Sequence, residues 1–115
     1  MTTINVNDVA RQMLVAAEGV FGEKWPEAKN FATSESKTFA QSMADIQTWK
    51  GLHQITEEQA RALSRLHQRS MKMVFTALEG ISLAMAEKAV NAALDAVRGA
   101  IKVISVIEVT RKPAG

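Results

Sequence analysis

The sequence has no cysteine and little proline, glycine or aromatic residue. Without cysteine, its 115 residues cannot form a disulfide, a thiolate metal site or a cysteine nucleophile. The two prolines are Pro26 and Pro113, so about 86 residues lie between them without a strong helix breaker. Aromatic residues make up 5% of the chain, and tyrosine is absent. The core must therefore pack through aliphatic side chains and close alanine contacts, as helix bundles do.

Long uncharged runs and a strong charge imbalance are also missing. No stretch of 18 residues is free of charge, so we expect no transmembrane segment. Residues 1–8 do not combine a basic stretch with an apolar run, so we expect no secretory signal and a cytoplasmic location. The net charge of +2 is too small to indicate a nucleic-acid partner.

What is present is typical of one folded domain. The chain is 47% hydrophobic and 23% charged, which is ordinary for a globular protein and argues against disorder. Its length fits a single helical domain over residues 1–115.

Two helices are predicted in the first half of the chain. The first begins near Asn7 or Asp8, because either side chain can cap the free N–H groups of a first turn. The second covers residues 26–50 and ends at Gly51, a natural helix terminator. Residues 33–38 are polar and poor helix formers, so we expect them to face solvent or to bend this helix.

A longer helix is predicted after them. Thr56 and Gln59 have the spacing of a capping box, which predicts a helix start at that point. The helical pattern continues to about Val109. Gly80 interrupts it, but a lone glycine costs only about 1 kcal/mol relative to alanine and does not itself make a turn. A continuous or kinked helix is therefore preferred to a hairpin at this glycine.

The final segment leaves one alternative open. Residues 101–109 are rich in β-branched side chains, which would suit a strand, but their polar positions do not alternate, so helix is preferred. The predicted fold is all-α: a helical bundle with two shorter N-terminal helices packed on one long C-terminal helix that is continuous or kinked at Gly80.

The C-terminal half of this predicted helix is apolar over more than half of its circumference. One partner covers an apolar arc of little more than 100°. Two shorter helices cannot easily cover the rest. Each Å² of apolar surface left in water forgoes roughly 25 cal/mol of the stabilisation that burial would give. A second copy of the protein would bury it, so a homo-oligomer is expected; the alternative is a self-contained four-helix bundle. The expected self-association interface consists of Ala93, Val97, Ala100, Ile101, Ile104 and Ile107.

A basic stripe is the second candidate interaction feature. Arg61, Arg65, Arg69 and Lys72 follow one another at steps of four, four and three, and so share one helix face. Phosphates or an acidic partner could line up along this stripe. The alternative is a solvated face on which Glu57 pairs with Arg61.

Residues suited to catalysis are scarce. His53 and His67 are the only histidines, and neither follows a Glu or Asp by three residues, as a di-iron bundle requires. A site made from both histidines and Glu57 would need a coincidence of folding. Serine nucleophile elbows and glycine-rich phosphate loops are absent, so neither enzymatic activity nor a cofactor is expected.

Three functions remain. The leading prediction is a non-enzymatic, self-associating helical protein that acts as a scaffold, adaptor or assembly subunit. The second is a reversible binder of a membrane or another anionic or apolar surface. The third is a bundle-type metal or cofactor enzyme.

Overall fold

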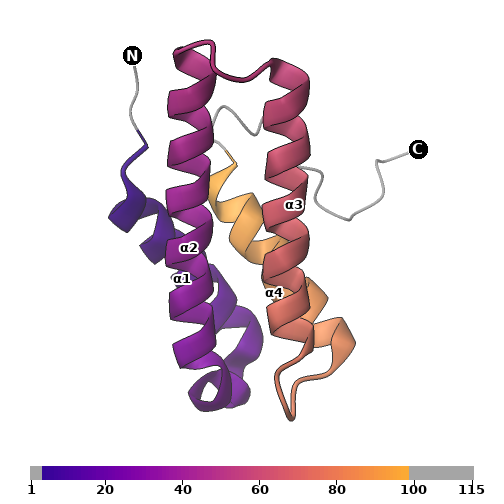
Figure 1. Cartoon of the computed structure of the whole chain (residues 1–115). Helices are drawn as coiled ribbons and strands as arrows, with labels where there is room; N and C mark the ends of the chain where they lie inside the picture. Colours follow the sequence, from indigo (N-terminus) through magenta and orange to yellow (C-terminus); the bar gives the residue numbers. More distant parts are fainter. Residues whose placement is uncertain (1–3, 99–115) are drawn as a thin grey trace, which may run out of the picture.

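The computed structural model describes residues 4–98, and in this range the chain is a bundle of four α-helices. The elements are α1 (Val6–Phe21), the short 3-10 helix η1 (Gly22–Lys24), α2 (Trp25–Gly51), α3 (Glu57–Thr76) and α4 (Leu83–Val97). Figure 1 shows α2 and α3 side by side, with α1 and α4 behind them. Each of α1 and α3 packs against both α2 and α4, so α1 and α3 occupy diagonal corners of the bundle. The all-α prediction is confirmed.

The helix starts follow from local hydrogen bonding. Asn5, rather than Asn7 or Asp8, caps α1: its side-chain oxygen accepts from the backbone N–H of Asp8 at 3.0 Å. The capping box of α3 is confirmed, because the Thr56 hydroxyl accepts from the Gln59 N–H at 3.1 Å while the Gln59 side chain accepts from the Thr56 N–H at 2.8 Å. Such caps satisfy N–H groups that a first helical turn leaves unpaired.

The prediction of one long C-terminal helix is wrong. α3 ends at Thr76, a turn follows, and α4 begins at Leu83. Gly80 adopts a φ of 81°, a left-handed conformation that ends a helical path and that glycine reaches without strain. Ser82 then caps α4, because its hydroxyl accepts from the Met85 N–H at 3.1 Å. The prediction overlooked Ser82 as a cap; together with Gly80 it makes a turn that neither residue makes alone.

The longest helix is α2, with 27 residues in the N-terminal half of the chain. It remains helical through residues 33–38. The expectation that this polar stretch faces solvent fails at Ser36, which is buried. The Thr33 hydroxyl donates to the Lys29 carbonyl at 2.7 Å, so it is satisfied within the helix. Over residues 4–98, no helix is both long enough and apolar enough to cross a bilayer.

The core lies where the four helices meet and is mainly aliphatic. Its aromatic part is small: the rings of Phe21 and Phe75 lie 5.6 Å apart and join α1 to α3 across the diagonal of the bundle. The largest side chains with almost no exposure also include Phe39, Met13, Met43, Ile46, Met71, Leu94 and Val97. Alanines that are fully or almost fully buried on α1, α2 and α4 let these helices approach closely.

Candidate interaction surfaces

Two residues of the expected self-association interface lie inside the chain's own core. Ala93 and Val97 are buried on the face of α4 that packs against the rest of the bundle, and α1 is the main neighbour of that helix. The break at Gly80 lets α4 fold back into the bundle, so this part of the apolar arc is covered within one chain. The other four residues of the expected interface, Ala100, Ile101, Ile104 and Ile107, lie outside the described residues.

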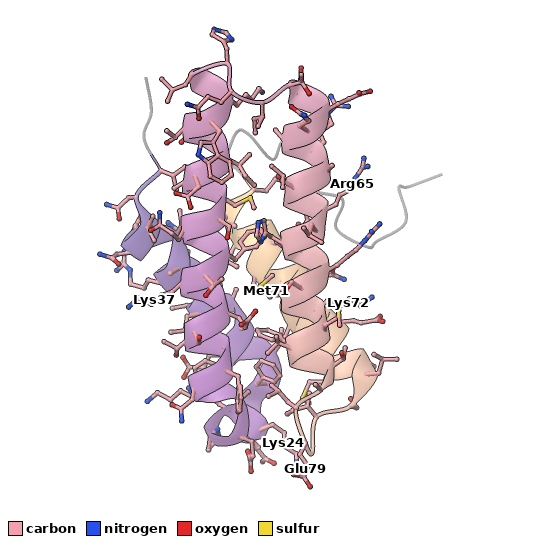
Figure 2. All side chains as sticks on the ribbon, viewed as in Figure 1. Lys24, Lys37, Arg65, Met71, Lys72 and Glu79 are labelled. Atoms are coloured by element: carbon pink, nitrogen blue, oxygen red, sulfur yellow. The ribbon has the colours of Figure 1, made fainter. Side chains whose placement is uncertain are left out.

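The basic stripe lies along one side of α3. Figure 2 shows Arg65 and Lys72 projecting from the side of α3 that faces away from α2. Arg61 pairs with Glu57 at 3.5 Å within α3, and Lys72 pairs with Glu87 of α4 at 3.4 Å. All four of these paired side chains are substantially exposed, and ion pairs of this kind contribute little stability. They do not prevent a partner's carboxylates from competing for the same cations.

Next to this stripe is an apolar ridge that the sequence analysis did not identify. Leu66 is 58% exposed and Met73 is 70% exposed. They are seven residues, or two helical turns, apart, and they lie opposite the buried face of α3 that includes Ser64 and Met71. We call this pair the α3 ridge. Its signal was visible in the sequence as two apolar residues one heptad apart on an otherwise polar face.

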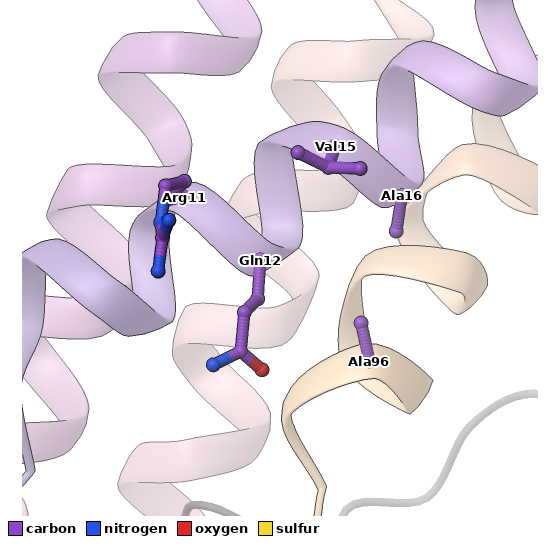
Figure 3. Close-up of a pocket in the computed structure, with 5 residues that line it drawn as sticks. All are labelled: Arg11, Gln12, Val15, Ala16 and Ala96. Carbon is purple, nitrogen blue, oxygen red and sulfur yellow. The ribbon is translucent and has the colours of Figure 1, made fainter.

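A shallow apolar hollow lies on a different side of the bundle, where α1 meets α4. It has a volume of about 360 Å³ and is lined by Val15, Ala16, Ala96, Arg11 and Gln12. Figure 3 shows the two alanines facing the space between the helices, with Val15 beside them. Val15 is 64% exposed, and the Arg11 guanidinium pairs with the Asp8 carboxylate. We call this the α1/α4 hollow.

A second opening lies between α2 and the end of α3. This cleft, of about 530 Å³, is lined by Phe31, Val74, Ala77 and Leu78, and by the carboxylates Glu27 and Glu79. Phe31 is about half exposed. Phe31 of α2 therefore lies at the edge of this cleft and is not part of the core.

The residues considered for metal binding do not come together. His53 lies in the α2–α3 loop with a φ of 59°, while Glu57 and His67 belong to α3. Across residues 4–98, no three side chains of the metal-binding types His, Asp and Glu lie close enough to hold an ion.

One carboxyl group has a shifted affinity for protons. Partial burial raises the pKa of Glu35 above its ordinary value. The folded protein therefore holds this proton more tightly than the unfolded chain does. The stability that results is present at low pH and is lost as the pH rises through the raised pKa.

Comparison of the chain with protein-family models, with curated proteins and with solved structures gives no match.

Proposed function

We propose that this protein is a non-enzymatic helical subunit that associates with copies of itself and acts as a scaffold or adaptor. The observation that carries the proposal is the α3 ridge, where Leu66 and Met73 are both largely exposed, two turns apart on one side of α3. Single exposed apolar residues are common, but aligned ones next to charged groups are typical of protein contacts. Val15 in the α1/α4 hollow supplies a second such position.

The C-terminal residues also support this proposal from the sequence side. Ala100, Ile101, Ile104 and Ile107 continue an apolar pattern beyond α4. Burying such side chains against a second copy would recover free energy that exposure forgoes, at roughly 25 cal/mol per Å². Apolar side chains that could contribute to the proposed association therefore occur both within residues 4–98 and in the C-terminal part of the sequence.

The experiment is a measurement of mass by light scattering during size-exclusion chromatography, from low to high micromolar concentration. We expect a mass at least twice the 12.5 kDa of one chain at the upper end of this range. A single monomer peak at every concentration would contradict self-association.

A second candidate function is reversible binding to an anionic surface. It is favoured by the position of the α3 ridge directly beside Arg65 and Arg69, because apolar and basic groups on one helix face suit an anionic membrane interface. Cosedimentation with anionic but not with neutral vesicles, reduced by salt, would support this function. Equal absence from both vesicle pellets would contradict it.

A further inference from the structure

We infer that self-association is head-to-tail: the α3 ridge of one copy packs into the α1/α4 hollow of the next. This inference rests on the proposed function and specifies its geometry. It assigns the exposed apolar residues of α1 and α3 to the two halves of one contact, with a second copy of this chain as the partner.

The first argument is shape. The α3 ridge projects from its helix through Leu66 and Met73. In the α1/α4 hollow, the small side chains of Ala16 and Ala96 leave about 360 Å³ beside Val15. Helices usually bury apolar area by packing projecting side chains of one helix into grooves or holes between side chains of another.

The second argument is charge. Arg69 lies between Leu66 and Met73 along α3, beside the line that joins them, and it is exposed. On α1, Glu18 lies one turn beyond Val15, outside the lining of the hollow, and is also exposed. The cation that lines the hollow, Arg11, is paired with Asp8. If Val15 packs between Leu66 and Met73, the Glu18 carboxylate comes within reach of the Arg69 guanidinium. Two ridges facing each other would instead bring Arg69 and its basic neighbours together, which like charges oppose.

The third argument is position. Because α1 and α3 occupy diagonal corners, their outward faces point away from each other. A copy bound through its ridge keeps its hollow available for another copy. Such a heterologous contact builds a ring if the rotation closes, or an open chain if it does not.

Two variants, each with one half of the contact blocked, test this geometry. Leu66→Glu with Met73→Glu blocks the ridge, and Val15→Glu blocks the hollow. All three positions are largely exposed, so both variants should keep the helical circular dichroism of the parent. We expect each variant alone to have the mass of a monomer. An equimolar mixture should give a complex of twice that mass, because one intact ridge and one intact hollow remain.

The matched control is Leu52→Glu, which adds a charge at an exposed apolar residue in the α2–α3 loop. It should assemble like the parent. A charge exchange tests the polar part of the contact. Glu18→Arg alone should weaken association roughly two- to five-fold. Combining it with Arg69→Glu should restore most of that loss, and the difference should shrink at high salt.

Four outcomes would overturn the inference. If the parent assembles and both blocked variants assemble equally well, the contact lies elsewhere, while the proposed self-association stands. If the two blocked variants are folded monomers and their mixture remains monomeric, the contact is not head-to-tail. If Val15→Glu lowers the melting temperature and the variant keeps the mass of the parent assembly, Val15 contributes to the stability of the chain and not to the contact between copies. A monomeric parent would refute both this inference and the proposed function.

Discussion

The side chain of Thr56 caps the N-terminus of α3. Its hydroxyl and the Gln59 side chain form reciprocal hydrogen bonds with two backbone N–H groups at the start of α3. Those groups have no partner within the helix, so the cap determines where α3 begins.

Replacing Thr56 by alanine should therefore reduce the free energy of unfolding by about 1 kcal/mol. Chemical denaturation followed by circular dichroism would measure it. Thr33→Ala is the control, because the Thr33 hydroxyl bonds only to a carbonyl within α2 and should matter little. Equal, negligible effects at both positions would show that the cap does not stabilise α3.

Individual residues also mark where sequence reasoning succeeds and where it fails. The capping box was predictable because it depends on two residues three apart. The burial of Ser36 was not, because a small hydroxyl inside a polar stretch gives no sign of whether a second helix will cover it. Met71 and Met73 differ in a way that the pattern could have indicated: Met71 lies on the buried face of α3, whereas Met73 lies one heptad from Leu66 on the polar face.

Among the elements, the turn between α3 and α4 has the largest effect on the architecture. It combines the left-handed Gly80, the Ser82 cap and the side chains of Leu78 and Ile81, which are buried and anchor the turn to the core. A single glycine was a weak signal for a helix break. The sequence contained a further signal in Ser82. The burial of Leu78 and Ile81 against the core, however, could be known only from the folded bundle.

Gly80→Ala should destabilise the protein by about 1–2 kcal/mol, because alanine in the left-handed conformation meets its own carbonyl. Open space surrounds the position, so this cost is one of backbone conformation and not of collision.

Gly19→Ala is the matched control, for which a change in stability of the opposite sign is expected. Gly19 lies within α1, and a methyl group there would meet no other atom within 4 Å. Alanine should therefore stabilise the protein by up to about 1 kcal/mol. Urea denaturation of both variants would test the pair, and a shift of the same sign for both would show that the turn does not depend on a left-handed residue.

The molecule as a whole depends on contacts between residues far apart in the sequence. The helical class was predictable from the spacing of apolar residues and from the rarity of proline. The arrangement was not, because the apolar face of α4 looked too wide for one chain to cover. The structure covers Ala93 and Val97 by bringing α4 back against α1. The α3 ridge and the α1/α4 hollow could not be paired before the diagonal placement of α1 and α3 was known.

The aromatic contact between Phe21 and Phe75 should be essential to this arrangement. Phe75→Ala should cost about 3–5 kcal/mol, because it leaves a cavity where α1 and α3 meet across the bundle. Thermal and chemical unfolding would measure the loss. Met73→Ala, two residues away and largely exposed, should leave the stability of the monomer nearly unchanged. Similar losses at both positions would contradict the burial that separates them.

The pairing of α1 with α4 also sets an order of events during synthesis. About 60 residues separate the end of α1 from the start of α4, so at about 5–20 residues per second a ribosome needs roughly 3–12 s to make them. Throughout that interval α1 lacks the helix that covers much of its apolar face, whereas α2 and α3 can already pair through their short loop. The nascent chain is therefore most exposed to aggregation and to chaperones just before its last helix emerges, and translational pauses ahead of Leu83 would prolong that state.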